Sequence, residues 1–290
     1  MHDRSTQLDN VSTAECVLDA RSLQIRRLVL RALKAADKGH VGAALSLIEI
    51  LRVLYDHIVR HDPTHPAWPE RDRVVLSKGH GCLALYAILA DQGYISLDTL
   101  DTFCERHSPL GGHPERAIAS GIEASTGALG HGLPFGTGMA IAHRRLGDGV
   151  RIFVIVGDGE LNEGSNWEAM MMASKHQLSN LVVIVDHNGQ QQSGPTDVVL
   201  PLGSLKKKFD AFGAATVEVD GHSPTALLEA FKRAASAQSG PPQVVVCRTV
   251  KGKGIAAAEH SALWHYKRSF GETLIKEIED LWVVTPNSGQ

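Results

Sequence analysis

The stretch RIFVIVGDGELNEGSNWEAM, residues 151–170, joins an apolar run to a glycine-rich acidic turn and then to a helical pattern. The run RIFVIV predicts a strand buried on both faces, because polar and apolar residues do not alternate in it. Three acids, Asp158, Glu160 and Glu163, follow within one turn. Burying a carboxylate is costly unless a cation or a hydrogen-bond donor compensates it. The stretch therefore predicts a strand, a polar turn at its carboxyl end, and a partner for these acids.

The second half of the chain repeats this alternation of apolar runs and helical segments. Continuous Val/Ile runs separated by helices predict a parallel sheet covered on both faces, which is a doubly wound, mostly parallel α/β fold. Ser223 is an expected N-cap, because its hydroxyl can accept a hydrogen bond from a free backbone N–H. We expect strands at 151–156, 180–186, within 216–222 and at 243–249, and helices at 166–176 and 223–238.

The first half is expected to be mainly helical. Ser96 predicts the start of a short helix, and RVVLS (73–77) predicts a short strand. Residues 107–138 are expected to be mostly loop, and residues 1–10 a mobile tail. No linker or repeat divides the chain, so residues 1–290 are expected to form one domain. Apolar periodicity predicts helices at 17–37, 44–59 and 82–93.

The composition excludes several classes of function. The 290 residues are 43% hydrophobic and 21% charged, with a net charge of -3, which argues against nucleic acid or a membrane as the main partner. The four cysteines show no C-x-x-C spacing, so neither a disulfide framework nor a zinc site is indicated. The N-terminus lacks an apolar signal segment and no run is long enough to span a membrane, so a cytoplasmic location is expected.

Three of the expected strands end in polar turns, and in an open α/β sheet ligands bind at this edge. The turn at 157–164 offers carboxylates, the turn at 186–194 offers an Asp/Asn pair with backbone carbonyls, and KGKG (251–254) offers lysines. An all-oxygen set of Asp158, Asn188 and a carbonyl suits a magnesium ion, whose remaining ligands would be phosphate and water oxygens.

The glycines of the GDG turn point to the same chemistry. Gly157 and Gly159 would let the backbone approach a phosphate closely. A GDG sequence also fits a plain strand-to-helix turn with an aspartate cap. The second polar turn, 30 residues after Asp158, favours the cation site, because adjacent strand ends would bring the two together.

A Gly-His step recurs five times in the chain. A single such histidine is most often a surface or capping residue, but several on separate turns indicate a cleft for a polyhydroxylated or carbonyl substrate that undergoes proton transfer. Zinc binding is the competing interpretation, although none of these histidines has the spacing of an H-E-x-x-H motif. The five histidines are His40, His80, His113, His131 and His222.

Taken in order, these motifs resemble the transketolase family. GDG followed about thirty residues later by an Asn behind an apolar strand is similar to the fingerprint of thiamine diphosphate enzymes. The resemblance spans roughly residues 20–270. It is carried by KAADKGHVGAALSLIEIL, DRVVLSKGHGCLALYAIL, GGHPE, STGALGHGL, GDGELNEGSNWEA, NLVVIVDHNG and VKGKG.

The resemblance implies a thiamine diphosphate-binding fold and a cofactor site. Asp158, Asn188 and the main-chain oxygen of Gln190 would hold Mg²⁺, with Ca²⁺ or Mn²⁺ as possible substitutes, and the metal would bridge the diphosphate. Gly127 and Leu129 would line the aminopyrimidine pocket. The full set of residues expected at the cofactor is His80, Gly127, Leu129, Gly157, Asp158, Gly159, Glu163 and Asn188.

The resemblance also implies catalytic roles. His80 and His265 would lie near the diphosphate and the reacting carbons, while His40 and His113 would contact the hydroxyls of the sugar and assist proton transfer. Glu163 is similar to the family's acid at the subunit contact, where it would hydrogen-bond the cofactor-activating glutamate of the partner. Glu160, in contrast, is expected to be solvated at a helix start, where negative charge is favourable.

The chain departs from the family pattern at three places. Ala128 stands where the family usually has Pro, and Gln190 where it has a hydrophobic residue. Only the backbone of Gln190 is required at the metal, so this second departure leaves the cation site intact. After His265 the chain reads YKRSF (266–270) rather than the family's Gly-Lys-Ala-Pro type.

Whole transketolases carry a second domain, which supplies the glutamate that activates the cofactor, and a third C-terminal domain. The present chain resembles only the N-terminal subunit of a split transketolase. The resemblance therefore implies a separate C-terminal subunit, an α2β2 assembly, and transfer of a two-carbon ketol unit from a ketose or ketose phosphate to an aldose acceptor. Pentose phosphates, branched-sugar phosphates and sulfosugars all remain open as substrates.

Several alternatives remain beside this interpretation. The α subunit of a 2-oxo acid dehydrogenase is split in the same way, but the Gly-His segments favour transketolase. A full 1-deoxyxylulose 5-phosphate synthase requires a longer chain, and a nicotinamide-dependent dehydrogenase requires a G-x-G-x-x-G after a strand, which the chain lacks. A catalytically silent subunit that retains the fold is the alternative outside enzymes.

Overall fold

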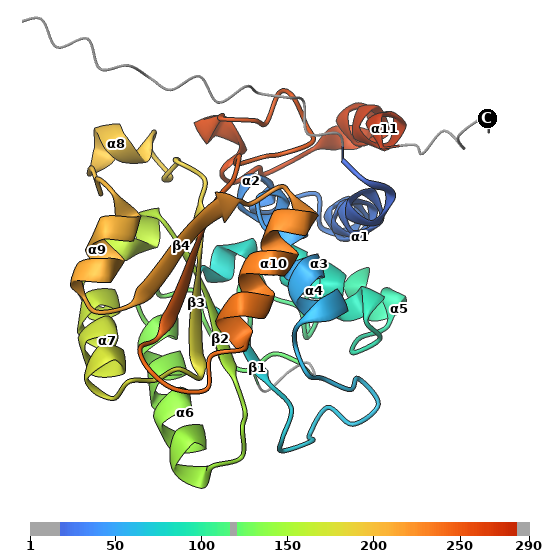
Figure 1. Ribbon diagram of the computed structural model, residues 1–290. Coiled ribbons are helices and arrows are strands. Elements are labelled where there is room, and N and C mark those ends of the chain that lie inside the picture. The colour runs from blue at the N-terminus through green and yellow to red at the C-terminus, as the bar shows by residue number, and fades with distance from the viewer. Residues whose placement is uncertain (1–17, 117–120, 283–290) are drawn as a thin grey trace, which may run out of the picture.

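The computed structural model describes residues 18–116 and 121–282. Within these residues one sheet of parallel strands has the order β1-β2-β3-β5-β4. Figure 1 shows the sheet between two layers of helices, so the expected doubly wound α/β fold is confirmed. The tail expected at residues 1–10 lies outside the described residues. The strands are β1 Arg73–Leu76, β2 Ile152–Gly157, β3 Leu181–His187, β4 Ala215–Asp220 and β5 Gln243–Arg248.

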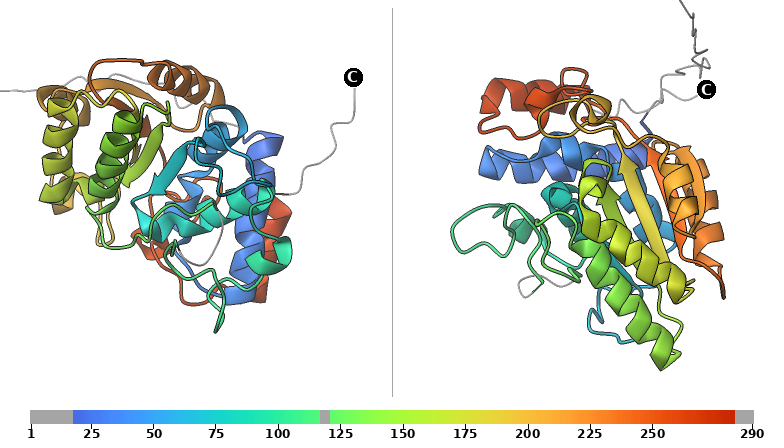
Figure 2. Two further views of the ribbon diagram at one scale, coloured as in Figure 1. Left: turned by 90° about the horizontal axis from the view of Figure 1, so that it is seen from below. Right: turned by 90° about the vertical axis from the view of Figure 1, so that its left-hand side faces the viewer.

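The two helical layers cover opposite faces of the sheet, as the two views of Figure 2 show. The first layer contains α1 Ala20–Ala36, α3 Ile48–His57, α4 Cys82–Asp91 and α10 Pro224–Ala235. The second contains α6 Gly132–Leu146, α7 Gly164–Lys175 and α9 Leu205–Ala211. The shorter elements and the last helix are α2 Val41–Leu45, α5 Leu97–Leu100, α8 Thr196–Val199 and α11 Gly271–Leu281, with 3-10 turns η1 Gly79–Gly81, η2 Gly159–Asn162 and η3 Ala262–Trp264.

Strand β2 explains why its sequence does not alternate. Phe153 and Ile155 pack in the core of the first layer, whereas Ile152, Val154 and Val156 pack in the core of the second. Both faces of the strand are therefore dry, and every position favours an apolar side chain. No helix among the described residues combines the length and the hydropathy needed to cross a membrane.

Most of the elements expected from the sequence are confirmed, with bounds shifted by a few residues. All nine residues Cys82–Ala90 of α4 are buried, as its apolar sequence predicts. Ser96 and Ser223 act as the expected N-caps, and their hydroxyls accept hydrogen bonds from the backbone N–H groups of Thr99 and Ala226.

The helix expected over 44–59 is wrong as a single element. The chain forms α2 and α3 instead, and the two helices are separated at Ser46 and Leu47. The hydroxyl of Ser46 donates to a carboxylate oxygen of Asp186 on β3 at 2.6 Å. A tertiary partner thus holds the residue at which the helical periodicity is interrupted.

The loop expected over 107–138 is also wrong at its end, because α6 begins at Gly132. A Cβ added at Gly136 would lie 2.3 Å from a methyl group of Val154, and one at Gly132 would lie 2.4 Å from the hydroxyl of Ser77. These glycines let the helix pack directly against the sheet. Pro134 lies in the first turn, where its missing N–H costs nothing.

Candidate functional site

A pocket of about 550 Å³ lies over the carboxyl ends of β1, β2, β3 and β5. In Figure 1 this is the end of the sheet toward which the β4 arrow points, beside α8 and α2. The three polar turns expected to converge do meet here. All the residues proposed for the site from the sequence line the pocket, namely His40, His80, His113, Gly127, Leu129, Gly157, Asp158, Gly159, Glu163, Asn188, Gln190 and His265.

Asp158 lies at the floor of this pocket and is 2% exposed. Its two carboxylate oxygens each accept a hydrogen bond at 2.7 Å, one from the backbone N–H of Gly159 and one from that of Gly189. Burial, and then the nearby charge of Asp186, raise the pKa of Asp158. Among the described residues no basic side chain forms an ion pair with this carboxylate.

Asn188 lies beside Asp158 because the two follow neighbouring strands. Its side-chain oxygen accepts a hydrogen bond from the backbone N–H of Gln190 at 3.1 Å, and its side-chain nitrogen donates to Asp186 at 3.1 Å. The turn that carries Asn188 also donates to Asp158 through Gly189. Asp158, Asn188 and Gln190 thus line the same pocket on turns that are hydrogen-bonded to each other.

Asp186, the next buried acid, has a different environment. It is fully buried on β3, and Lys78 forms an ion pair with it. Ser46 and Thr249 donate hydroxyl hydrogen bonds to the same carboxylate. Burial alone would raise the pKa of Asp186, but the Lys78 ammonium and these donors hold it below its usual value. Asp186 is therefore satisfied within the chain.

Lys251, which follows β5, is the second buried cation at the pocket. It is 1% exposed, and its ammonium donates to Nδ1 of His265 at 2.9 Å and to the main-chain oxygen of Gln191 at 3.1 Å. Burial, followed by the charge of Lys78, lowers the pKa of Lys251 from 10.5 to about 8. In the part of the chain that the structure describes, no carboxylate forms an ion pair with Lys251.

Four imidazole rings gather on the other wall of the pocket. The centroid of the His40 ring lies 5.5 Å from that of His80, 5.9 Å from that of His113 and 5.4 Å from that of His265. Burial lowers the pKa of both His40 and His265 to about 4, and it lowers the pKa of His80 well below its ordinary value. These three rings are therefore neutral at pH 7 and able to accept protons.

The position of His265 follows from the backbone around it. Gly39 and Lys267 exchange two backbone hydrogen bonds of 3.0 Å, which pin the segment after η3 beside His40. The sequence after His265 departs from the family, yet the ring still reaches the pocket.

Within residues 18–116 and 121–282, no three His, Cys, Asp or Glu side chains are arranged to hold a metal ion.

Two Gly-His steps lie elsewhere. His131 is exposed at the start of α6, and His222 is buried under the loop that follows β5; neither lines the pocket. The recurrence of the dipeptide therefore identified three pocket residues out of five. What distinguishes these three is that their turns border the pocket, whereas His222 follows β4 at the outer edge of the sheet.

Glycine is required where the pocket wall approaches the His113 ring. Gly127 has a φ of +139°, and a Cβ added there would lie 2.9 Å from the imidazole of His113. At Gly159 a Cβ would lie 2.9 Å from the side chain of Gln191. Leu129 lines the pocket beyond Gly127. A side chain at either glycine would therefore narrow the pocket or displace its wall.

The expectation that Glu160 is solvated is wrong. Glu160 is 2% exposed, and its carboxylate accepts hydrogen bonds from the hydroxyl of Ser77 and from the backbone N–H groups of Gly130 and Gly157, the latter two at 3.0 and 3.1 Å. Burial raises the pKa of Glu160. The residue ties the ends of β1 and β2 to the loop that carries Leu129. The helix-start pattern missed this because the donors of Gly130 and Ser77 lie 30 and 83 residues away.

Glu163 was expected at a subunit contact, a role that stays a prediction. It precedes α7, and its side chain is exposed at the edge of the pocket with no hydrogen bond or ion pair to another described residue.

Sequence reasoning did not select Lys78, Lys251 or Asp186 as site residues. Each follows or ends a buried strand, which is the signal that could have found them. The KGKG turn was recognised as a lysine-bearing strand end, but its sequence does not reveal that the Lys251 ammonium is buried with no ion-pair partner in the described part of the chain.

Comparisons with known proteins agree with the fold. The family model described as "Transketolase, thiamine diphosphate binding domain" matches residues 19–288. An apulose-4-phosphate transketolase subunit of Actinobacillus succinogenes is 40% identical to the chain; the match covers 94% of this chain and 98% of that protein. The 6-deoxy-6-sulfo-D-fructose transketolase subunit SqwG of Clostridium sp. is 39% identical, with 89% of this chain and 90% of that protein covered.

A solved transketolase from Pichia stipitis has a similar structure. The TM-score is 0.84 at 31% sequence identity, and the match covers 90% of this chain. The chain spans 40% of that transketolase, so it corresponds to one part of the longer protein.

Proposed function

Because the chain belongs to the transketolase family and matches its thiamine diphosphate-binding domain, we propose that it is the diphosphate-binding subunit of a two-subunit, Mg²⁺-dependent transketolase. The expected transketolase-type transferase class agrees with the names of its relatives. The assembled enzyme would transfer a two-carbon ketol unit from a ketose or ketose phosphate to an aldose acceptor. One observation carries the proposal: Asp158 and Lys251, both buried at one pocket, lack ion-pair partners within the described residues.

These two charges fit a metal diphosphate. A buried charge is costly unless it is paired, and Asp158 and Lys251 do not pair with each other. A magnesium ion would compensate the carboxylate, and a diphosphate would compensate the ammonium, while the metal and the diphosphate compensate each other. We propose that Asp158, Asn188 and the main-chain oxygen of Gln190 hold the metal. Ca²⁺ or Mn²⁺ would fit the same oxygen set.

The remaining pocket residues would contact the cofactor. The glycine turn at Gly157 and Gly159 is proposed to lie against the phosphates, with Lys251, His80 and His265 around them. The segment at Gly127 and Leu129 is proposed to line the aminopyrimidine end, because it forms the wall between the glycine turn and His113.

The pocket histidines are proposed to accept and donate the protons of the reaction. When bound, thiamine diphosphate supplies the carbon nucleophile and the electron sink for cleaving a carbon–carbon bond next to a carbonyl. His40 and His113 both line the pocket, with their ring centroids 5.9 Å apart. Both would hydrogen-bond the hydroxyls of the sugar. His40, with its lowered pKa, would take up a proton only transiently, as a general base needs to do.

A separate C-terminal subunit is proposed to complete the site. The relatives described above are, by their names, subunits of transketolases, and they match this chain over nearly their full lengths. Glu163 is exposed at the pocket edge, where it would meet the cofactor-activating glutamate of the partner. The helices α6 and α7 expose the apolar side chains of Phe135, Met171 and Met172, which would suit a subunit contact within an α2β2 assembly.

The sugar is proposed to be a phosphorylated or sulfonated ketose. The two relatives are named for apulose-4-phosphate and for 6-deoxy-6-sulfo-D-fructose, which share a ketose carbonyl and a terminal anionic group. A donor panel of both compounds and of pentose phosphate ketoses, given to the assembled enzyme, would rank these classes.

The test of the proposal has two measurements. Calorimetry of the chain with its partner subunit should show thiamine diphosphate binding that requires Mg²⁺, and ketol transfer should require both subunits. Binding without transfer in the complete assembly would indicate a catalytically silent subunit. Absence of any Mg²⁺-dependent binding by the assembly, or full transfer by the isolated chain, would contradict the proposal.

A further inference from the structure

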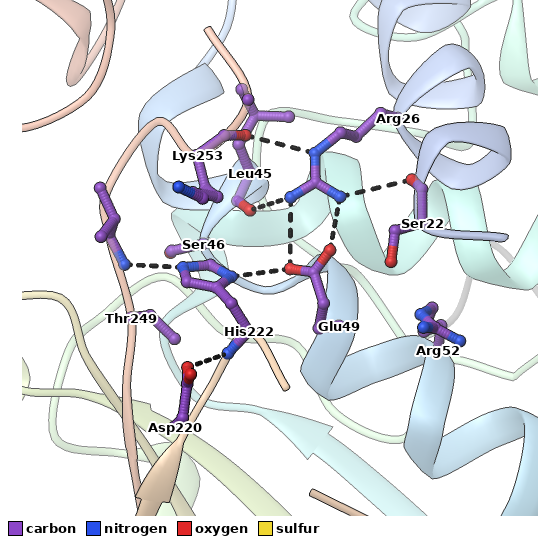
Figure 3. A network of polar contacts seen from close by, with 12 residues as sticks. Ser22, Arg26, Leu45, Ser46, Glu49, Arg52, Asp220, His222, Thr249 and Lys253 are labelled. Atoms are coloured by element: carbon purple, nitrogen blue, oxygen red, sulfur yellow. Dashed lines mark hydrogen bonds and ion pairs between the residues drawn. The ribbon is translucent and has the colours of Figure 1, made fainter. Parts of the chain in front are cut away.

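The fifth Gly-His step has a position that the proposed site does not explain. His222 follows β4, is 5% exposed and lies outside the pocket, beneath the loop at 249–254 that carries Lys251. Figure 3 shows it in a network of polar contacts with Glu49 and Arg26. We infer that His222 is a positioning residue, which acts through the main chain of Val250 to hold the Lys251 ammonium in the pocket. The inference rests on the proposed function, in which Lys251 meets the diphosphate.

The hydrogen bonds of His222 have a fixed direction. Its Nε2 accepts from the backbone N–H of Val250 at 2.8 Å, and because a backbone N–H can only donate, Nε2 carries no proton. Nδ1 therefore carries the ring proton and donates to Glu49 at 2.8 Å. The Asp220 carboxylate also accepts a hydrogen bond from the His222 backbone N–H at 2.9 Å. One tautomer of a neutral ring is thus selected.

Glu49 is held in turn by Arg26. The fully buried Arg26 guanidinium donates to both oxygens of the Glu49 carboxylate, at 2.6 and 3.2 Å. Burial alone would raise the pKa of Glu49, but the charge of Arg26 and the hydrogen bonds from His222 and Arg26 hold it far below its ordinary value. Glu49 therefore remains an acceptor that keeps the His222 proton on Nδ1.

The network forms hydrogen bonds with the loop backbone on both sides of Lys251. On one side His222 binds the N–H of Val250, and on the other Nε of Arg26 donates to the main-chain oxygen of Lys253 at 3.2 Å. The N–H of Gly252 donates to the main-chain oxygen of Gly42 at 3.0 Å. The loop backbone is therefore fixed at 250, 252 and 253.

Lys251 makes its own contacts from this fixed backbone. Its side chain leaves the loop between the hydrogen-bonded residues Val250 and Lys253. Its ammonium donates to His265 and to the main-chain oxygens of residues 190 and 191. A long side chain with a buried charge loses affinity for an anion if its backbone anchor moves, because the ammonium then finds another acceptor. By fixing the backbone of this loop, the buried network thus sets the position of the Lys251 side chain in the pocket.

Two substitutions separate the hydrogen bonds of His222. His222→Gln places an acceptor near the position of Nε2 and keeps the contact to Val250, whereas His222→Asn places a donor near Nδ1 and keeps the contact to Glu49. Asp91→Asn is the matched control, since Asp91 forms a part-buried ion pair with Arg21 on the first helical layer, away from the loop.

The readout is the affinity of the complete two-subunit protein for inorganic diphosphate with Mg²⁺, measured by calorimetry. Loss of an outer contact to a metal or ligand residue typically costs 10–100-fold in affinity, so H222N should weaken binding by roughly tenfold. H222Q should stay close to the wild type, and D91N should leave binding unchanged. In a Lys251→Met background, H222N should produce no further loss.

Three results would overturn the inference. These are an H222Q protein as weak as H222N, an H222N protein as tight as the wild type, and an H222N loss that is undiminished in the K251M background. If H222N does not fold, the comparison of H222Q with K251M tests the inference. Binding of Mg²⁺-diphosphate by H222Q as tight as by the wild type supports the inference. Binding by H222Q as weak as by K251M contradicts it.

Failure of the proposed function would look different. If the wild-type assembly binds no Mg²⁺-diphosphate, that proposal fails first, and hydrogen exchange of the loop at 249–254 then tests the positioning. Faster exchange in H222N but not in H222Q supports control of the loop by His222. Equal exchange in H222N and the wild type refutes it.

Discussion

Asp158 and Asp186 end or follow neighbouring strands, and both are buried, yet their pKa values shift in opposite directions. Asp186 has Lys78 as a counter-ion and two hydroxyl donors, which lower its pKa. Asp158 has two backbone N–H donors and no ion-pair partner among the described residues, and burial raises its pKa. Burial of an acid at a strand end therefore does not by itself set the direction of its pKa shift; the charges and hydrogen-bond donors around it decide.

The two buried lysines repeat the contrast with the opposite sign. Lys78 is compensated by Asp186, whereas Lys251 contacts an imidazole and main-chain oxygens. Lys78 and Asp186 thus compensate each other within the folded chain, whereas Asp158 and Lys251 have no ion-pair partner among the described residues and are the charges proposed to meet the metal and the diphosphate. Substitutions at each pair should separate stability from binding.

The largest effect is expected from Asp186→Asn. The change leaves the Lys78 ammonium buried without its counter-ion, and breaking a buried pair in this way costs about 3–5 kcal/mol. The free energy of unfolding, measured by urea denaturation, should fall by this amount. The exposed Asp197 on α8 provides the control, because D197N should unfold like the wild type. Equal stability of D186N and D197N would mean that Lys78 is compensated in another way.

Asp158→Asn should have the opposite profile. The substitution removes a charge that burial and Asp186 disfavour, so the unfolding free energy of the ligand-free chain should be unchanged or slightly higher. Magnesium-dependent binding of thiamine diphosphate should weaken by roughly 100-fold, because even outer partners of metal ligands are worth 10–100-fold. Calorimetry at fixed cofactor and varied Mg²⁺ measures this. Wild-type affinity in D158N would place the metal elsewhere.

Glu160→Gln should have a smaller effect on stability. The amide replaces one acceptor oxygen by an NH₂ group, which then faces a hydroxyl or a backbone N–H instead of accepting from it. Leaving such a buried donor unsatisfied costs about 1–3 kcal/mol. Glu168 on the exposed side of α7 is the control, and E168Q should unfold like the wild type. If both variants unfold alike, Glu160 does not tie the pocket segments together.

The smallest effect is expected in the pH dependence of stability. The folded-state pKa of His40 is about 4, below its ordinary value of 6.5. Between these values the unfolded chain binds more protons than the folded one, so the contribution of His40 is complete above pH 6.5 and is lost as the pH falls toward 4. The slope from one such group is at most about 1.4 kcal/mol per pH unit, and solvent screening of this half-buried ring makes the actual change smaller.

His40→Asn should remove this contribution. Unfolding free energies measured between pH 4 and 6.5 should therefore depend less on pH in H40N than in the wild type, while above pH 6.5 the two curves should run parallel. An exposed histidine such as His65 serves as the control. Identical slopes for H40N and the wild type would show that the His40 ring is protonated in the folded protein.

Much of the fold was predictable because its signals are local. The Val/Ile runs of β2, β3 and β5 mark strands buried on two faces, and the caps at Ser96 and Ser223 act within three residues. The errors arose where a distant contact overrides a local pattern. Gly136 was expected in a loop, but it lies in α6, where the absence of a side chain lets the helix pack against Val154. The helix expected over 44–59 is interrupted where Ser46 hydrogen-bonds Asp186.

The candidate site was predictable to a similar extent. The resemblance placed twelve residues, all of which line one pocket, because their motifs lie on turns at one edge of a parallel sheet. It did not select Lys251, and Glu160 was misjudged, because the burial of a charged side chain depends on what packs over it. For Glu160 that cover comes from segments near Ser77 and Gly130.

The amino-acid sequence by itself determined the alternation of strands and helices, the polar turns at the strand ends and the family to which the motifs belong. These features depend on residue type at short spacing, and apolar periodicity and glycine act at that range. Only the tertiary structure decided which buried charge has a partner. Lys78 and Asp186 are 108 residues apart, and Glu49 and His222 are 173 apart. Coulomb energy and desolvation depend on distance in space, so the chain had to fold before Asp158 and Lys251 could be recognised as buried charges of opposite sign with no ion-pair partner among the described residues.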